Sequence, residues 1–197
     1  MVYAMSYRPK ASSYPRAEWL NGDRTKVDVE DKTPDGGTGL NISQMFSGRR
    51  LGTEHLPTRI EWQCRRSLLD FEATGLYNVS PRFRDLIEQI EPGTHQFVPV
   101  AFVARDGAPL DTRWFWQVCN RLDSVHRERT TFVLDRGSWG PPEQGESRLI
   151  FDRQKIGNAK FWHDKHDIRG PMITDDVKDR LEAAGMTGIH FKYYEDA

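Results

Sequence analysis

The chain has 197 residues, 37% of them apolar and 29% charged, which is typical of a folded protein with one large domain or a domain with an ordered N-terminal extension. It has no apolar run of about 18 residues, so no transmembrane helix is expected. The first residues lack the apolar core of a secretory signal. The 28 basic and 29 acidic residues nearly cancel, which argues against a dedicated nucleic-acid binder. We therefore expect a cytoplasmic protein, with Cys64 and Cys119 as buried free thiols.

The N-terminal third, residues 1–68, is predicted to be rich in loops. Val2 to Tyr7 and Thr58 to Cys64 are strand candidates, the second because its apolar and polar residues alternate. Asp35 to Gly39 is rich in glycine and is expected to form a mobile loop. These glycines neither follow a strand nor precede GK[ST], so they do not predict a phosphate-binding loop.

The clearest local signal lies between Val79 and Val100, where a helix is followed at once by a strand. Ser80 is a good N-cap, and Pro81 occupies the first helical position, where a missing N–H costs nothing. Apolar residues then recur at helical spacing on one face: Phe83, Leu86, Ile87 and Ile90. We expect Leu86 and Ile87 to be nearly fully buried against the following strand, Gln96 to Ala104. Pro99 indicates an edge or a bulge within that strand.

The second half of the chain is predicted to contain mainly strands. Strand patterns occur at Thr112 to Asn120, Thr130 to Asp135, Arg148 to Asp152, Ala159 to His163 and Gly188 to Tyr194. We expect a tight connection at 155–158 to join two of these strands, and residues 137–145 to form a loop. A second helix is expected after Thr174, which should cap it, and the last strand should enter the main sheet.

These elements predict an α+β fold. It would consist of a largely antiparallel sheet with two main helices packed on it, and a loop-rich N-terminal third. Residues 1–68 would hold the loops and the first strands, and residues 69–197 would form the α+β core. The two parts together are expected to make one compact domain.

Two polar clusters could carry chemistry. His163, His166 and Asp167 could serve as metal ligands of a small hydrolase, but residues three apart on a strand point to opposite faces. A solvated hairpin tip is the simpler interpretation. Asp123 and Ser124, with His126 nearby, lack a nucleophile elbow and are expected to be polar turn residues. We expect no cofactor.

One aromatic residue indicates a contact surface. Trp139 lies in a stretch rich in Gly and Pro that offers no evident strand to bury it, so it is a candidate interaction anchor. Packing of the tryptophan back on its own loop is the alternative. Arg136, Glu143 and Glu146 flank it, and we predict that these four residues contribute to a partner-binding surface.

The chain resembles a bacterial family of polymorphic-toxin immunity proteins, the eleventh numbered group, formerly a domain of unknown function. The resemblance covers roughly Leu69 to Tyr194. It is carried by the following residues: Asp70-Phe71, Val79-Ser80-Pro81-Arg82, Leu86-Ile87, Ile90-Glu91-Pro92-Gly93, His95-Gln96-Phe97, Asp123, Val133-Leu134-Asp135, Leu149 to Asp152, Ile156-Gly157, Ile173-Thr174-Asp175, Leu181, Ala184-Gly185-Met186-Thr187-Gly188 and Phe191.

The resemblance implies a non-enzymatic cytoplasmic protein that binds and neutralises a cognate toxin encoded by an adjacent gene. Toxins paired with such proteins are often nucleases, which would make the partner basic, and this chain with its net charge of −1 is only weakly acidic. Two alternatives stay open from the residues alone. One is the metal-dependent hydrolase using His163, His166 and Asp167, and the other is a nucleic-acid-binding module built on short arginine runs.

Overall fold

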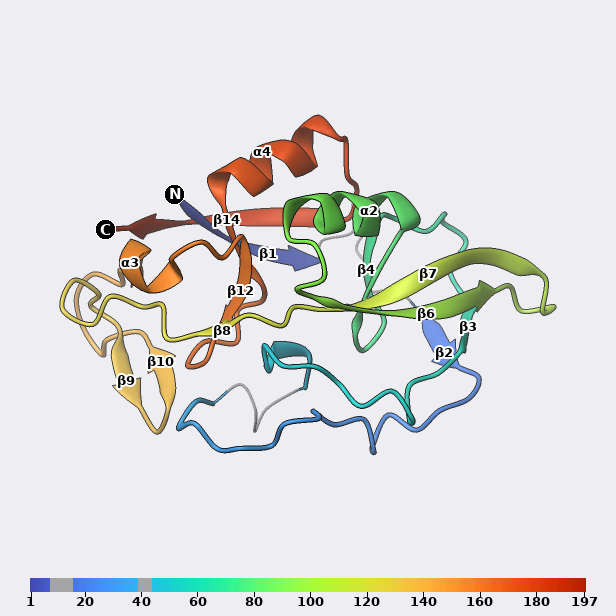
Figure 1. Ribbon diagram of the computed structural model, residues 1–197, viewed down its shortest axis with the longest axis horizontal. Coiled ribbons are helices and arrows are strands. Elements are labelled where there is room, and N and C mark those ends of the chain that lie inside the picture. Colours follow the sequence, from blue (N-terminus) through green and yellow to red (C-terminus); the bar gives the residue numbers. More distant parts are fainter. Residues whose placement is uncertain (8–15, 39–43) are drawn as a thin grey trace.

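The fold was examined in a computed structural model, which describes residues 1–7, 16–38 and 44–197. It contains two six-stranded sheets and a separate two-stranded hairpin, with helices packed on the sheets (Figure 1). Most strand pairs are antiparallel, with parallel pairs β3–β6, β8–β12 and β11–β14. The predicted α+β class with a largely antiparallel architecture is therefore confirmed, although the strands divide between two sheets.

The two sheets draw on distant parts of the chain. The first has the spatial order β11 (Ile150–Phe151), β14 (Ile189–Asp196), β1 (Val2–Tyr7), β13 (Met172–Thr174), β12 (Phe161–Asp164) and β8 (Arg121–Leu122). The second has the order β2 (Ala17–Trp19), β3 (Arg59–Trp62), β6 (Gln96–Val103), β7 (Pro109–Gln117), β5 (Tyr77–Val79) and β4 (Phe71–Ala73). The hairpin consists of β9 (Val133–Asp135) and β10 (Ser138–Gly140).

Helix α2 (Pro81–Ile90) begins where the sequence predicts, and Ser80 accepts a hydrogen bond from the backbone of Phe83 (3.3 Å). Phe83 and Ile87 are fully buried, but Leu86 is only partly buried, so the expectation of near-complete burial fails for Leu86. The helix packs mainly on β7 and not on β6.

The C-terminal elements combine correct and wrong predictions. Helix α4 (Asp175–Ala183) has Thr174 at its N-cap, yet no side-chain bond closes that cap. The last strand, β14, enters the first sheet as predicted and pairs with both β1 and β11. The short helix α3 (Arg153–Ile156) occupies the expected tight connection, and β11 and β12 do not pair with each other. Residues 138–140 form a strand where a loop was expected.

Three apolar clusters hold these elements together. The central one joins both sheets and both longer helices through residues such as Met5, Phe71, Ile87, Trp116 and Leu181. A second lies between the first sheet, the β9–β10 hairpin and α3. The third buries Val27, Val29, Leu51 and Leu56 of the N-terminal third against the second sheet. The N-terminal third therefore contributes to the core, because its apolar residues cover a sheet face that would otherwise meet water.

Candidate functional site: the β9–β10 hairpin and the cleft beside it

The hairpin predicted to carry the partner contact is anchored in the core by its tryptophan. Trp139 is 7% exposed and packs in the second apolar cluster with residues such as Val125 and Phe151. Its backbone N–H donates to the carbonyl of His166 (3.0 Å), which ties β10 to the segment after β12. The expectation that Trp139 has no strand to bury it is therefore wrong, and its ring packs on residues of other elements and not only on its own loop. Its role is to hold the hairpin in place.

Arg136 occupies the turn between β9 and β10, and its side chain is 94% exposed. Among the described residues it alone, glycines apart, has a positive φ, at 47°. The next carbonyl, that of Gly137, accepts a hydrogen bond from Nδ1 of His166 (2.9 Å). The nearest carboxylate, that of Asp135, is 4.0 Å away. The turn thus holds an almost fully hydrated cation on a backbone that is tied to the core.

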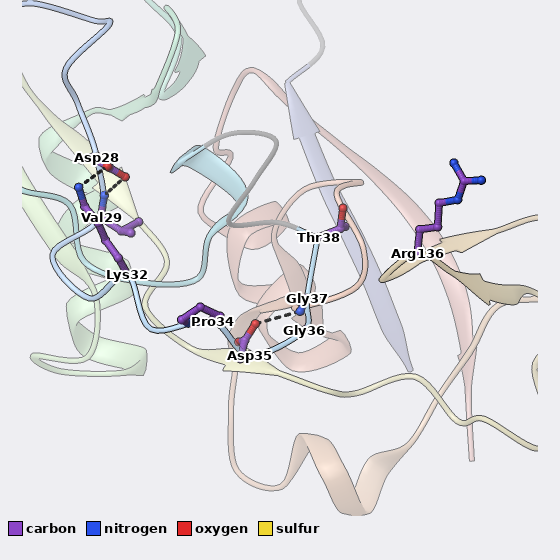
Figure 2. A pocket seen from close by; sticks show the side chains of 9 residues that line it. All are labelled: Asp28, Val29, Lys32, Pro34, Asp35, Gly36, Gly37, Thr38 and Arg136. Atoms are coloured by element: carbon purple, nitrogen blue, oxygen red, sulfur yellow. Dashed lines mark hydrogen bonds and ion pairs between the residues drawn. The ribbon is translucent and has the colours of Figure 1, made fainter.

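A cleft of about 370 Å³ separates Arg136 from the N-terminal segment 28–38 (Figure 2). The guanidinium points away from Asp35 and the glycines, so Arg136 forms a rim of the cleft. At Gly137 a Cβ atom would lie 2.8 Å from the carbonyl oxygen of Gly36, so the turn and the segment touch directly. This close approach, at a φ of 82°, requires glycine at position 137.

The far wall of the cleft is held by partly buried ion pairs. Oδ2 of Asp35 lies 2.6 Å from Nε of Arg121, Oδ1 accepts from Nη2 of the same arginine (2.9 Å), and Arg49 approaches to 3.3 Å. The bonds from Arg121 are the main reason that the pKa of Asp35 lies well below its usual range. In the expected mobile loop, Asp35 is therefore held by ion pairs and also accepts a hydrogen bond from the backbone N–H of Gly37 (3.0 Å). Gly39 lies outside the described residues.

The two glutamates of the predicted surface lie in the segment that follows β10. Both Glu143 and Glu146 are exposed, and the backbone carbonyl of Glu146 accepts a hydrogen bond from the hydroxyl of Thr131 (2.6 Å). This bond places their segment beside the start of β9. Neither glutamate lines the cleft at Arg136, so the structure brings the four predicted residues to one hairpin region but not to one cavity.

Both histidines proposed as metal ligands are buried within the fold. His163 is completely buried, and this burial lowers its pKa to about 3, so its ring is neutral at neutral pH. His166 bonds the hairpin turn, and Asp167 pairs with Arg169 (2.7 Å). The expectation of a solvated hairpin tip is wrong, because residues 161–164 form a buried strand. Within the described part of the chain, no three His, Cys, Asp or Glu side chains gather in a way that could hold a metal ion.

In the second polar cluster, Ser124 belongs to the core, whereas Asp123 and His126 are partly exposed. Ser124 is fully buried, where an exposed turn was expected. Its hydroxyl donates to Asp164 (2.8 Å) and accepts from the indole N–H of Trp162 (3.0 Å). Burial raises the pKa of Asp164. Ser124 is thus committed to bonds that join the segment after β8 to β12.

The family comparison covers nearly the whole fold. A model of an immunity protein family, Imm11, matches residues 18–196. The chain belongs to the Imm11 immunity protein family. The match begins well before Leu69, so the family pattern includes most of the N-terminal third, which the sequence resemblance did not reach. Membership indicates a role in immunity to a toxin. None of the curated proteins compared with this Imm11 chain matches it, and no helix in its described residues is long and apolar enough to cross a membrane.

Residues that carry the family resemblance form two structural clips in this Imm11 protein. In the first, Asp70 accepts hydrogen bonds from Ser80, Arg82 and Thr187. Arg82 also donates to the two carbonyls that follow α4, those of Ala184 and Gly185. Burial alone would raise the pKa of Asp70, but these bonds hold it well below its ordinary value. The clip fixes the start of α2 to the end of α4.

The second clip connects the end of α2 to the other sheet. Glu91 accepts from the ring of His95 (2.9 Å) and from the backbone N–H groups of Lys160 (2.8 Å) and Phe161 (3.0 Å). Nearby, the side-chain amide of Gln96 bonds the backbone of Leu51 twice: its oxygen accepts from the N–H (2.7 Å) and its nitrogen donates to the carbonyl (2.8 Å). These recognisable motifs of the Imm11 chain therefore position the scaffold, and within the hairpin they comprise the residues of β9, Val133 to Asp135.

Proposed function

We propose that this protein protects its cell by binding a toxin encoded by an adjacent gene and covering the toxin's active site, without catalysing a reaction itself. The observation that carries the proposal is the match to an immunity protein family over residues 18–196. Neutralisation would take place in the cytoplasm of a bacterium that competes with its neighbours through secreted toxins. In this proposal the partner is a protein, and neither a membrane nor a nucleic acid takes part.

The hairpin region is the proposed toxin-binding surface. It presents Arg136, Glu143 and Glu146, all exposed, together with Val133, an apolar side chain that is 55% exposed. Trp139 supports this surface from below, because its buried ring fixes the hairpin. A surface that is already rigid loses little conformational entropy on binding, which favours affinity. Its mixture of charges allows ion pairs with either sign on the toxin.

The primary experiment combines the purified protein with the toxin domain from the neighbouring gene. We expect a complex of defined stoichiometry in calorimetry, survival of cells that express both proteins, and loss of toxin activity in the mixture. If the toxin is a nuclease, its cleavage of nucleic acid should stop when the protein is present in excess. The proposal fails if no complex forms at micromolar concentrations and the cells are not protected.

Charge reversals locate the surface. Arg136→Glu and a Glu143→Lys, Glu146→Lys double variant should each weaken toxin binding by about tenfold or more, while the melting temperature stays unchanged because these side chains are exposed. Arg180→Glu, at an exposed site on α4, is the matched control and should bind normally. Normal binding by all three variants would place the interface elsewhere without affecting the immunity role.

A further inference from the structure

A second cavity lies between the β6–β7 ribbon and the chain after β3. In Figure 1 this ribbon extends toward the end of the molecule opposite the β9–β10 hairpin. This groove has a volume of about 430 Å³. One wall is the chain that follows β3, residues 64–68, and the other is formed by Ala104, Leu110 and Asp111 of the ribbon. Its volume lies within the range of sites that accept small ligands or single side chains.

The first wall of the groove is held in one conformation. The indole N–H of Trp62 donates to the carbonyl of Arg66 (3.0 Å), and the Arg66 guanidinium lies 4.9 Å from the centre of the Trp62 ring. The same guanidinium makes two bonds, of 2.6 and 2.8 Å, to the fully buried carboxylate of Glu72. Because the stacked guanidinium and its two hydrogen bonds already hold this wall, it needs no reordering when a partner binds.

The groove combines apolar surface with an excess of positive charge. Leu110 is 48% exposed although its side chain is large and apolar, and Leu68 is partly buried beside it. The carboxylate that lines the groove, Asp111, is paired with Arg113 (3.2 Å). Arg65, which lines the groove, forms no ion pair within the described residues, which include every Asp and Glu of the chain. Arg105 and its neighbour Asp106, in the adjoining turn, likewise form none there. An anion in the groove would therefore meet one unpaired guanidinium group, that of Arg65, with Arg105 in the turn next to the groove.

We propose that this groove binds an acidic segment of a partner polypeptide that carries one large apolar side chain. The apolar side chain would cover Leu110 and Leu68, which removes their exposed surface from water. Carboxylates on either side of it would pair with Arg65 and Arg105, because guanidinium and carboxylate groups match in shape as well as charge. The site lies apart from the hairpin, so it does not depend on the proposed toxin contact.

The test uses the full chain and three fluorescein-labelled synthetic peptides. The first consists of aspartate and glutamate around a single leucine, the second has glycine in place of the leucine, and the third has lysine in place of the acidic residues. We expect saturable binding of the first peptide in fluorescence anisotropy, binding about tenfold weaker for the second, and none for the third. Absence of saturable binding of the first peptide would overturn the proposal.

Variants confirm the location. Arg65→Glu and Leu110→Ser should each weaken binding of the first peptide by about tenfold, whereas Arg180→Glu on α4 should not change it. Melting curves identify any variant that fails to fold, and Arg105→Glu, in an exposed turn, provides a second charge reversal. A labelled single-stranded oligonucleotide is the competitor. If it binds more tightly than the acidic peptide and requires Arg65, the groove is a nucleic-acid site and the proposal is wrong.

Discussion

Replacement of Asp70 by asparagine should strongly destabilise the protein. Asp70 is 7% exposed, and its two carboxylate oxygens accept hydrogen bonds from Ser80, from two nitrogens of Arg82 and from both the N–H and the hydroxyl of Thr187. An amide of the same shape removes the charge and turns one acceptor into a donor. That donor would face other donors, so at least one buried polar group would lose its partner.

The expected loss is about 2–4 kcal/mol, because the buried carboxylate gives up charge-assisted hydrogen bonds and leaves a donor unpaired, while its partner Arg82 is half exposed. That is a large share of the roughly 5–15 kcal/mol by which a typical domain is stable. The effect should depend on pH. The pKa of Asp70 is lower in the folded protein than its value of 3.8 in an unfolded chain. Its contribution is therefore complete above pH 3.8 and is lost as the pH falls further.

Urea denaturation followed by circular dichroism, at neutral pH and near pH 3, measures both effects. The gap in unfolding free energy between wild type and Asp70→Asn should be large at neutral pH and smaller in acid. Asp85→Asn is the matched control, because Asp85 is an exposed carboxylate on α2, the helix whose start Asp70 holds, and it should tolerate the change. A loss below about 1 kcal/mol at neutral pH, or a gap independent of pH, would refute the reasoning about this clip.

Three further predictions, which use four substitutions, test the core. Burial lowers the pKa of His163 to about 3, against 6.5 in an unfolded chain. Between these two pH values the imidazole binds a proton in the unfolded state and not in the folded state. The free energy of unfolding therefore decreases as the pH is lowered. His163→Leu should remove about 2–3 kcal/mol of the stability that the wild type loses between pH 7 and 4.5. Parallel pH profiles for the wild type and the variant would contradict this. In denaturant titrations, Ile87→Ala should lower the free energy of unfolding by about 2–5 kcal/mol, and Leu86→Ala should lower it clearly less. Equal losses would contradict the unequal burial of the two side chains. Trp139→Ala should cost about 3–5 kcal/mol, and an unchanged melting temperature would show that the hairpin is not anchored by this ring.

Local sequence determined the elements whose signals are contained within a few neighbouring residues. Helix α2 is one, because its cap, its N1 proline and its apolar stripe all lie within Ser80 to Ile90. Pro99 was also predicted correctly as an edge residue, since β3 pairs with β6 only from Ala101 to Val103 and leaves Pro99 with a single neighbouring strand. These properties depend on contacts near in sequence, so periodicity and capping are sufficient to find them.

The division into two sheets could not be predicted in this way. Strands β4, β5, β8 and β13 have two or three residues each, too few for an alternating pattern to appear. Their existence depends on neighbours far along the chain; β13, for example, pairs with β1 at the opposite end of the sequence. Short strands are stable only because the partner strands and the shared core are already present.

The candidate site shows the same division. The sequence alone singled out Arg136, Glu143 and Glu146 as charged residues in a polar stretch, and the structure leaves all three exposed. Only the tertiary structure decided that Trp139 is buried, because the residues that cover it, such as Val125 and Phe151, come from other elements. The cleft beside Arg136 likewise exists because Gly36 and Gly137, distant in sequence, are pressed together by packing. Burial is a property of the whole fold, and local composition does not contain it.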